Sequence, residues 1–327
     1  MENKLTSIEL CAGAGGQALG LHLAGFKHEL LIELDNAACE TLRINNRENN
    51  LSWKSIHEGC LKEFSHLDLS EYQGIDLVAG GVPCPPFSKA GKQLGQDDDR
   101  DLFPSALKVI EKINPKAVML ENVSGLLDQK FSEYRRHIND MLIHLGYHPR
   151  WKLLNASDFG VPQLRPRVIL IAIKNEYSDK FQFPDEKISP KTVGETLYDL
   201  ISSRGWEGAF DWSKKANGIA PTLVGGSKKH GGPDLGPTRA KAEWKKLFVN
   251  GHRLSDLAPP HDFTGEKEGY ENMPLLTVRM AARIQGFPDW WHFYGKKTAA
   301  YRQVGNALPP PVSFAIGKRI YAAINNG

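Results

Sequence analysis

The first half of the chain alternates short apolar runs with segments in which apolar residues recur at helical spacing. The runs are rich in Val, Ile and Leu, which is typical of strands buried on both faces of a parallel sheet. They predict strands over residues 5–10, 28–34, 75–81, 117–123 and 167–173, with helices over 17–26, 36–45, 102–113 and 134–147. This alternation predicts an α/β fold, a doubly wound and mostly parallel sheet covered by helices.

The alternation stops at about residue 181. The chain then becomes rich in Gly, Pro, Trp and Lys, and helical spacing returns over residues 276–287 and 311–324. We therefore expect two domains: a core domain built from residues 1–180 and 274–327, and a smaller domain, residues 181–273, inserted into it.

Positive charge is concentrated in one part of the chain. Residues 204–253, called the basic region below, hold ten Lys and Arg against four Asp and Glu, a formal charge of +6, which leaves −3 for the rest. The total of +3 is too small to indicate a nucleic-acid partner by itself. A local surplus of this size suits a polyanionic ligand.

The four cysteines are scattered and form no C-x-x-C pair; they are Cys11, Cys39, Cys60 and Cys84. The sequence shows no charged-then-apolar leader and no long apolar run. We therefore expect reduced thiols, a cytoplasmic protein, no metal site and no membrane span.

Glycines follow the first predicted strand. In "IELCAGAGG", Gly13, Gly15 and Gly16 allow a tight turn and a close approach of the backbone to a ligand at a helix N-terminus. The second strand reaches Glu33 about 20 residues further on, where a carboxylate can accept hydrogen bonds from ribose hydroxyls. Together these features favour an adenosine-bearing cofactor over a purely structural turn, and they fit NAD and S-adenosylmethionine equally.

Cys84 stands in "DLVAGGVPCPPFSKAG", directly after a predicted strand and so at the carboxyl edge of the sheet. A free cysteine is most often a buried packing residue. Here three neighbouring prolines fix φ and remove backbone N–H groups, a stiffening that a core thiol does not need. A thiol is a poor hydrogen-bond acceptor and a good nucleophile, so "CPPF" favours covalent attack at carbon over the amino-group chemistry of the related Asp/Asn-Pro-Pro-aromatic motif.

Two further polar stretches are predicted at the same edge. "ENV" places Glu121 and Asn122 at the end of a strand, and "QLRPR" places Arg165 and Arg167 two residues apart before another strand, so both can point to one side of an extended chain. A strand-end cap or a solvated basic turn would explain either stretch alone. Cysteine, carboxylate and arginine at sheet edges together favour one concerted arrangement.

These stretches resemble the motifs of the cytosine-C5 DNA methyltransferases. "ELCAGAGG" is similar to that family's cofactor turn, "PCPPFS" to its nucleophile motif, "ENV" to its glutamate motif and "QLRPR" to its Gln-x-Arg-x-Arg motif. "LTVRMAARIQGFPD" and "YRQVGNALPPPVSFAIG" are similar to its last two blocks. The resemblance covers residues 7–175 and 274–322 in the family's order, and the family's target-recognition segment falls in the gap that holds the basic region.

The resemblance implies a sequence-specific DNA (cytosine-5-)-methyltransferase that uses S-adenosylmethionine and acts on a cytosine flipped out of double-stranded DNA. Cys84 would add to C6 of the base, Glu121 would hold N3 and the amino group, Arg167 would contact O2, and Arg165 would contact the nearby backbone. Residues 88–103, with small hinge residues and mixed charge, are the candidate lid. We expect a monomer in the bacterial cytoplasm, near the nucleoid, belonging to a restriction–modification system.

The resemblance also assigns cofactor contacts by position. Glu33 would bind the ribose, with Leu34 and Leu61 beside the adenine; the remaining contacts would come from Cys11, Ala12, Gly13, Gly15, Gly16, Cys60, Pro83, Leu102 and Asn306. Three positions depart from the family's pattern: Cys11 replaces an aromatic residue, Cys60 an aspartate and Met280 a glutamate. We expect the first two to weaken the adenine half of the site and the third to be structural.

Three other functions compete with this one. A tRNA cytosine-C5 methyltransferase would share the fold and the cysteine, but such enzymes carry Cys-Phe-Thr where this chain has Asp262 in "DFTGEKEGY". A catalytically silent DNA-binding regulator typically lacks the cysteine or the glutamate, and both are present. A nicotinamide oxidoreductase would explain the glycines but not "PCPPF", "ENV" or "QLRPR".

Overall fold

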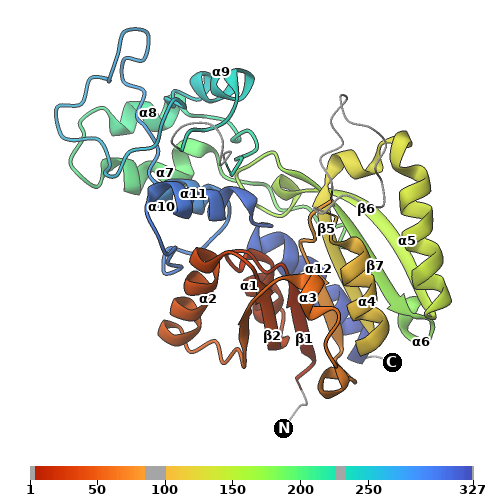
Figure 1. Cartoon of the computed structure of the whole chain (residues 1–327). Coiled ribbons are helices and arrows are strands. Elements are labelled where there is room, and N and C mark those ends of the chain that lie inside the picture. Colours follow the sequence, from red (N-terminus) through yellow and green to blue (C-terminus); the bar gives the residue numbers. More distant parts are fainter. Residues whose placement is uncertain (1–3, 85–100, 226–232, 326–327) are drawn as a thin grey trace. The chain divides into compact units, whose positions relative to one another are not determined.

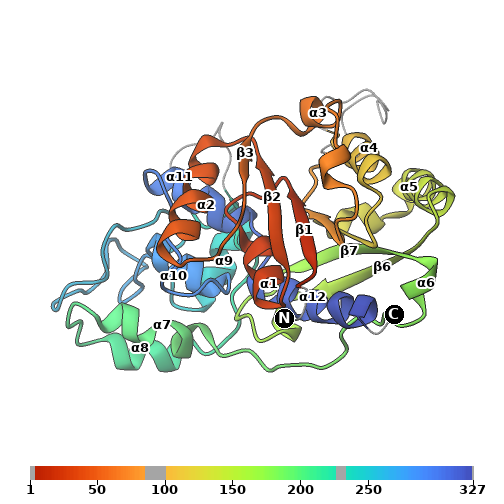
Figure 2. The ribbon, with the colours of Figure 1, turned by 90° about the horizontal axis from the view of Figure 1, so that it is seen from below.

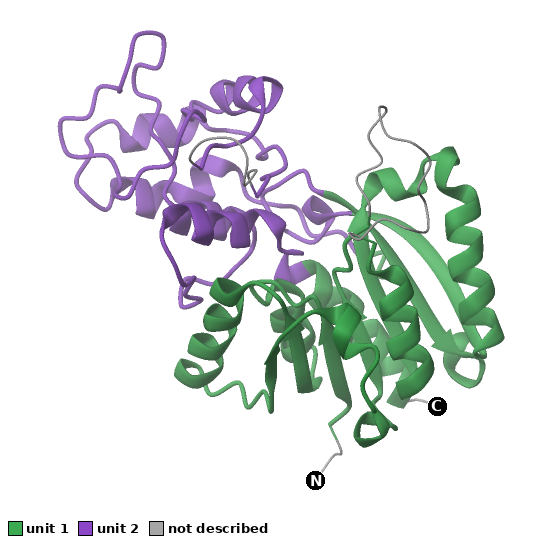
Figure 3. Ribbon diagram, in the orientation of Figure 1, with its two compact units in different colours: residues 1–154, 166–185, 312–327 green, residues 155–165, 186–311 purple. Residues whose placement is uncertain are grey.

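The computed structural model describes residues 4–84, 101–225 and 233–325 (Figure 1). The chain divides into two compact units (Figure 3). Unit 1 comprises Met1–Leu154, Pro166–Asp185 and Val312–Gly327, and unit 2 comprises Asn155–Arg165 and Glu186–Pro311. The units therefore differ from the expected domains, because residues 155–165 and 274–311 group with the inserted segment.

Unit 1 is built on one sheet of seven strands in the order β3-β2-β1-β4-β5-β7-β6. The strands are β1 (Thr6–Leu10), β2 (Lys27–Glu33), β3 (Ile56–Glu58), β4 (Leu77–Gly80), β5 (Ala117–Val123), β6 (Tyr147–Asn155) and β7 (Pro166–Lys174). Pairing is parallel from β3 through β5, and β7 runs antiparallel to β5. The five predicted strands and the mostly parallel sheet are confirmed, and β3 and β6 are additional.

Helices cover both faces of this sheet. They are α1 (Gly16–Leu23), α2 (Asn36–Glu48), α3 (Leu61–Phe64), α4 (Phe103–Ile113), α5 (Ser132–His144), α6 (Asn175–Ser178) and α12 (Pro310–Asn325). In Figure 2, α3, α4 and α5 lie above the strands, and α1 and α12 lie below them. The doubly wound architecture is thus confirmed.

Alternation along β1 shows how the sequence selects these faces. Ile8 and Leu10 belong to the core formed with α3, α4 and α5, so Ser7 and Glu9 point to the opposite face, because successive side chains of a strand alternate. On that second face the ring of Tyr321 on α12 packs edge-on against Phe26. Each side of the sheet therefore has its own apolar layer.

Unit 2 contains short helices joined by long connections. They are α7 (Val193–Ser202), α8 (Ala209–Lys215), α9 (Thr238–Lys246), α10 (Val278–Ile284) and α11 (Lys297–Asn306). Its core contains Trp212, Trp244 and Trp291, each fully buried. Met280, buried at the start of α10, lies with its sulfur 3.4 Å from the N–H of Thr277. This is the structural role expected for that departure from the family's pattern.

Candidate active site

The turn after β1 is held against the end of β2 by Glu33. One carboxylate oxygen accepts the N–H of Gly13 at 2.7 Å and the other accepts the N–H of Asp35 at 2.8 Å. Gly13 has φ +53°, a left-handed conformation that glycine adopts at low cost, and a Cβ there would meet no atom within 4 Å. The turn therefore leaves open space beside an oriented carboxylate, as a ribose-binding site requires.

The predicted adenine contacts follow β1, β2 and β3 at the same edge of the sheet. Leu34 is 69% exposed directly after Glu33, an apolar side chain that a bound ring could cover, whereas Leu61 is buried. Cys11 and Cys60 are partly exposed free thiols. Burial, followed by the charge of Glu33, raises the pKa of Cys11, so this thiol is neutral near pH 7. These positions offer an apolar, uncharged surface to a ligand.

Ala12, Gly15 and Gly16 complete the turn. The N–H of Gly15 donates to the carbonyl of Ala12 at 3.0 Å, and Gly15 has φ +82°. Gly16 begins α1, so the helix N-terminus points its free N–H groups toward the turn. A buried carboxyl and a buried amide, those of Glu9 and Gln17, lie nearby in the sequence, and no hydrogen-bond partner for either is found within the described part of the chain. The donor set fits a cofactor that carries a ribose and a polar tail.

Cys84 is fixed by its neighbour at the end of β5. Its thiol donates to Oδ1 of Asn122 at 2.9 Å, and Nδ2 of Asn122 donates to the carbonyl of Val82 at 2.8 Å. One amide thus holds both the cysteine side chain and the backbone that carries it. Burial raises the pKa of the Cys84 thiol, and the charges of Asp101 and Glu121 add to the increase. The thiol is therefore protonated at neutral pH.

Glu121 lies beside the same segment. Its Oε1 lies 2.8 Å from Nε of Arg167, and a Cβ on Gly81 would lie 3.2 Å from its Oε2. Antiparallel pairing of β5 with β7 makes this possible, since it sets the start of β7 beside the end of β5. The structure therefore brings Cys84, Glu121 and Arg167 to one edge of the sheet.

Arg165 has different partners from Arg167, although both were expected to point to one side. It is 1% exposed, and its guanidinium donates to the carbonyls of Leu223 and Gly305, both at 2.7 Å. Asn306 follows Gly305 at the end of α11 and is also part of unit 2. Arg165 thus connects separate segments of unit 2.

Gln163, from the same "QLRPR" motif, is fully buried in unit 2. Its Nε2 donates to Oε1 of Gln285 at 2.6 Å, and its Oε1 accepts the N–H of Leu223 at 2.8 Å. The motif therefore also holds together separate segments of unit 2, through the bonds of Gln163 to Gln285 and Leu223. Sequence reasoning assigned no role to Gln163, and no periodicity marks it.

Sequence reasoning also missed two side chains close to Cys84 in unit 1. Tyr134 on α5 donates its hydroxyl to Asp101, which stands just before α4. Leu102, at the N-cap of α4, donates its N–H to the carbonyl of Pro83 at 3.2 Å. This backbone bond joins two residues predicted to contact the cofactor. Of the candidate lid, residues 88–103, the part from 88 to 100 lies outside the described residues.

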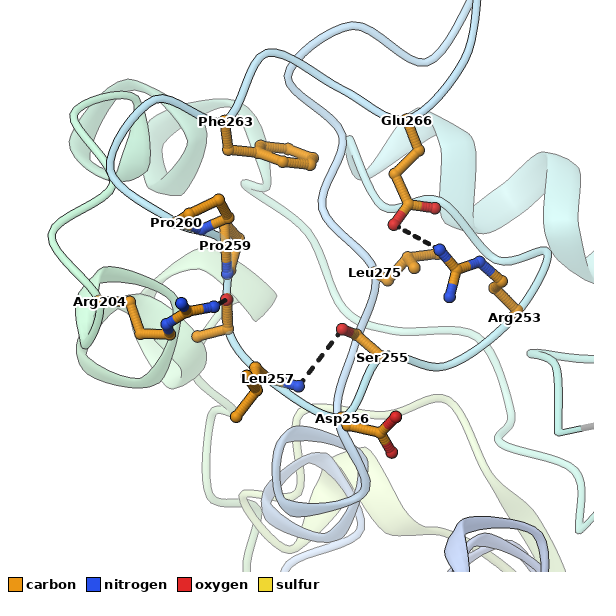
Figure 4. A pocket seen from close by; sticks show the side chains of 11 residues that line it. Arg204, Arg253, Ser255, Asp256, Leu257, Pro259, Pro260, Phe263, Glu266 and Leu275 are labelled. Carbon is orange, nitrogen blue, oxygen red and sulfur yellow. Dashed lines mark hydrogen bonds and ion pairs between the residues drawn. The ribbon is translucent and has the colours of Figure 1, made fainter.

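Unit 2 has a pocket of about 310 Å³ that is lined mostly by residues 255–275, with Arg204 and Arg253 from the basic region (Figure 4). Its lining includes Pro259, Pro260 and Phe263 together with four charged residues, of which Arg253 and Glu266 pair at 2.7 Å; the other two are Arg204 and Asp256. Phe263 is held in place by Trp206, whose indole N–H donates to the Phe263 carbonyl at 2.7 Å. The pocket therefore has fixed walls and a charged edge.

Metal ligation and membrane insertion have no structural counterpart in the described part of the chain. Within residues 4–84, 101–225 and 233–325, no group of three or more His, Cys, Asp or Glu side chains could hold a metal ion. In the same ranges no helix has the length and apolarity that a bilayer crossing requires.

Comparison with known proteins identifies the family to which the chain belongs. The sequence model described as "C-5 cytosine-specific DNA methylase" matches residues 5–322. The type II methyltransferase M.NaeI of Lentzea aerocolonigenes is 54% identical over 98% of this chain and 76% of its own length. The type II methyltransferase M.NgoMIV of Neisseria gonorrhoeae is 52% identical over 98% of both chains.

A solved structure agrees with the sequence matches. It is that of a protein assigned as a DNA modification methyltransferase, encoded within a prophage of E. coli. It superposes with a TM-score of 0.66 at 25% identity, over 98% of this chain and 99% of that chain.

Proposed function

The chain belongs to the C-5 cytosine-specific DNA methylase family and is a DNA (cytosine-5-)-methyltransferase, and we propose that Cys84 is its nucleophile, assisted by Glu121 and Arg167. The observation that carries this proposal is the meeting of the Cys84 thiol and the Glu121–Arg167 ion pair at one sheet edge. Asn122 connects these two parts of the site. It directly follows Glu121 in the chain, and its side chain bonds to the Cys84 thiol and to the Val82 carbonyl.

Covalent addition solves the chemical difficulty of this reaction. Carbon C5 of cytosine is a weak nucleophile, and addition of the Cys84 thiolate to C6 converts the ring into an enamine with a reactive C5. Because burial raises the pKa of Cys84, the thiol must lose its proton when substrate is present. After methyl transfer a base removes the C5 proton, the Sγ–C6 bond breaks, and Cys84 is regenerated.

Glu121 would hold N3 and the exocyclic amino group of the base. Protonation of N3 stabilises the ring as the thiolate adds, so Glu121, ionised in its pair with Arg167, must first take up a proton before it can pass one to N3 as an acid catalyst. The ion pair with Arg167 orients the carboxyl group, and the Arg167 guanidinium can donate to the cytosine O2. Arg165 would act on the backbone of the segments that it joins.

The cofactor implied by the family is S-adenosylmethionine, which when bound supplies an electrophilic methyl group. Glu33 would accept hydrogen bonds from its ribose, since two backbone N–H groups already orient the carboxylate. Leu34, Leu61, Cys11 and Cys60 would contact the adenine. The N-terminal turn of α1 and its glycines would receive the polar tail. Pro83, Leu102 and Asn306 are the remaining proposed cofactor contacts.

The inserted segment, residues 181–273, most of which belongs to unit 2, is the proposed target-recognition domain. A cytosine inside a base stack cannot reach Cys84, so it must be flipped out, and the protein must hold the remaining duplex. Exposed lysines of the basic region, among them Lys214, Lys215, Lys245 and Lys246, would contact phosphates. Arg253 and Glu266 suit the major-groove edge of a G·C pair, because arginine donates to guanine and glutamate accepts from the cytosine amino group.

The biological setting is a restriction–modification system, since both close relatives are type II methyltransferases. DNA as substrate would place the enzyme with the chromosome, in the bacterial cytoplasm near the nucleoid. The expected monomeric state stays a prediction, for which light scattering of the purified chain is the measurement.

Methylation mapping tests the function directly. Bisulfite sequencing of a plasmid that carries the expressed gene should show one recurring site with a protected cytosine, and Cys84→Ser should remove the protection. In parallel, radiolabelled methyl transfer is measured on duplex DNA and on tRNA. Transfer to tRNA without transfer to DNA would contradict the proposal and favour the RNA alternative.

A further inference from the structure

The backbone at Cys84 is held from two sides. On one side, Asn122 bonds to the thiol and to the carbonyl of Val82. On the other side, the N–H of Leu102 donates to the carbonyl of Pro83, the residue that directly precedes Cys84. The second attachment therefore depends on the position of Leu102 at the start of α4.

Asp101 determines that placement. Its carboxylate is 5% exposed, and Oδ1 accepts the N–H of Phe103 at 3.1 Å, which caps the first turn of α4. The Tyr134 hydroxyl, from α5, lies 2.8 Å from both carboxylate oxygens. The ring of Tyr134 packs edge-on against Phe103, with centroids 5.9 Å apart. A cap on α4 would need only the bond to Phe103; the tyrosine adds an attachment to a second helix.

We propose that Tyr134 is a positioning residue for the reaction: it holds Asp101 at the start of α4, and through the Leu102–Pro83 bond it fixes the thiol of Cys84. The proposal rests on the proposed role of Cys84. Asp101, Leu102 and Pro83 form a continuous connection from α5 to the nucleophile, and each link is a hydrogen bond or a peptide bond.

The charge of Asp101 gives the connection an electrostatic signature. The carboxylates near the thiol are those of Asp101 and Glu121, and both raise the pKa of Cys84 after burial has raised it. Burial followed by the bond to Asp101 raises the pKa of Tyr134, so its hydroxyl stays a donor. By donating to Asp101, Tyr134 offsets part of the negative charge that the thiol senses.

The test compares Tyr134→Phe, Asp101→Asn and Tyr147→Phe in the full chain. Tyr147 is the matched control, because its buried hydroxyl donates to the carbonyl of Pro115 at 2.6 Å and has no part in the connection to Cys84. Three quantities are measured: the single-turnover methyl-transfer rate, the KM for DNA, and the pH at which alkylation of Cys84 is half-maximal in the free enzyme.

We expect Tyr134→Phe to lower the single-turnover rate about tenfold, the scale of one missing charge-assisted hydrogen bond, with little change in KM. The alkylation midpoint should rise in Tyr134→Phe and fall in Asp101→Asn, since the first variant strengthens the nearby negative charge and the second removes it. Tyr147→Phe should lower thermal stability and leave rate and midpoint unchanged.

A Tyr134→Phe protein that loses stability like Tyr147→Phe but keeps the wild-type rate and midpoint would overturn the proposal. A different result would contradict the proposed role of Cys84 as nucleophile, namely methyl transfer by the Cys84→Ser variant. The alkylation midpoints do not depend on turnover, so they still test the connection in that case.

Discussion

Arg167 and Glu121 form an ion pair, with Nε 2.8 Å from Oε1, on adjacent strands that run in opposite directions. Both side chains are largely buried, with 14% and 12% of their surfaces exposed. Removing one partner of such a pair changes more than charge, because the other partner loses its orientation.

Glu121→Gln should slow the chemical step by roughly 10² to 10⁴ and leave DNA affinity nearly intact, since the amide cannot act as the acid. The measurement is single-turnover methyl transfer together with a binding titration. Glu133→Gln, at an exposed position of α5, is the matched control and should behave as wild type. If Glu121→Gln weakened binding without slowing the single turnover, Glu121 would be structural.

The reactivity of Cys84 should depend steeply on pH. Burial, reinforced by Asp101 and Glu121, raises the pKa of this thiol, so its thiolate fraction is small at neutral pH and increases as pH rises. Alkylation of Cys84 by iodoacetamide in the free enzyme should accelerate about tenfold per unit between about pH 6.5 and 8.5. Mass spectrometry of the modified peptides measures this, with the fully buried Cys39 as the unreactive control. A rate that levels off near pH 7 would show a lowered pKa instead.

Glu9 should make the folded state less stable as pH rises. Burial raises its pKa well above the ordinary value, so the carboxyl is neutral when folded and ionises when the chain unfolds. The unfolded state then binds fewer protons, and stability decreases from the ordinary pKa of glutamate upward. Glu9→Gln should remove this contribution, so the difference in urea midpoint between variant and wild type should grow in the variant's favour as pH rises above about 4.5.

The exposed Glu133→Gln is again the control and should leave the pH dependence of stability unchanged. The quantity compared is the slope of the urea midpoint against pH. The new amide of Glu9→Gln has its own hydrogen-bonding needs, which change the stability by the same amount at every pH. Parallel curves for Glu9→Gln and wild type would contradict the assignment of a neutral buried carboxyl.

How much of this could be predicted from the sequence differs between the core and the inserted segment. Strands β4 and β5 contain apolar runs and β1 contains the apolar residues of "IEL", so their existence followed from pattern alone, whereas the strand order in the sheet was not predicted. Strand β6 has a partly exposed, polar sequence, "YHPRWKLLN", without an apolar run, and was missed. The antiparallel direction of β7 depends on its connection to β6, and no local sequence feature predicts this direction.

The candidate site shows the same division. Cys84 comes shortly after β4, Glu121 lies near the end of β5 and Arg167 near the start of β7, so a shared sheet edge predicted their meeting. Asp101 stands at the end of a run of acidic residues and Tyr134 on an amphipathic helix, where each resembles an ordinary surface residue. Their bond depends on how α4 and α5 pack, which sequence patterns do not specify. In unit 2 the helical spacing over residues 276–287 predicted α10, whereas α7, α8, α9 and α11 were missed because they are short and separated by Gly and Pro.

DNA affinity and site choice should be separable in unit 2. Lys214 and Lys215 are exposed at the end of α8, where their charges can follow phosphates. Replacing both with alanine should flatten the slope of log affinity against log salt by about 0.9 for each phosphate that is no longer bound, and leave the methylated site unchanged. Lys228 and Lys229, expected to share this role, lie outside the described residues.

The control is Lys54→Ala with Lys318→Ala, two exposed lysines of unit 1, which should leave the salt slope as it is. Arg253→Ala is the contrasting variant, because removal of a base-reading side chain should relax the site in bisulfite maps. An unchanged salt slope in the Lys214/Lys215 variant would move DNA binding away from α8.

The central claim is that Cys84 bonds to C6 of the target cytosine. Duplex DNA that carries 5-fluorocytosine at the methylated position tests it most directly, because fluorine cannot leave as a cation and the adduct cannot resolve. With S-adenosylmethionine present, the wild-type chain should form a denaturant-resistant complex with this DNA, and Cys84→Ser should form none and transfer no methyl groups. Turnover by Cys84→Ser, or a complex of equal yield in that variant, would contradict the account.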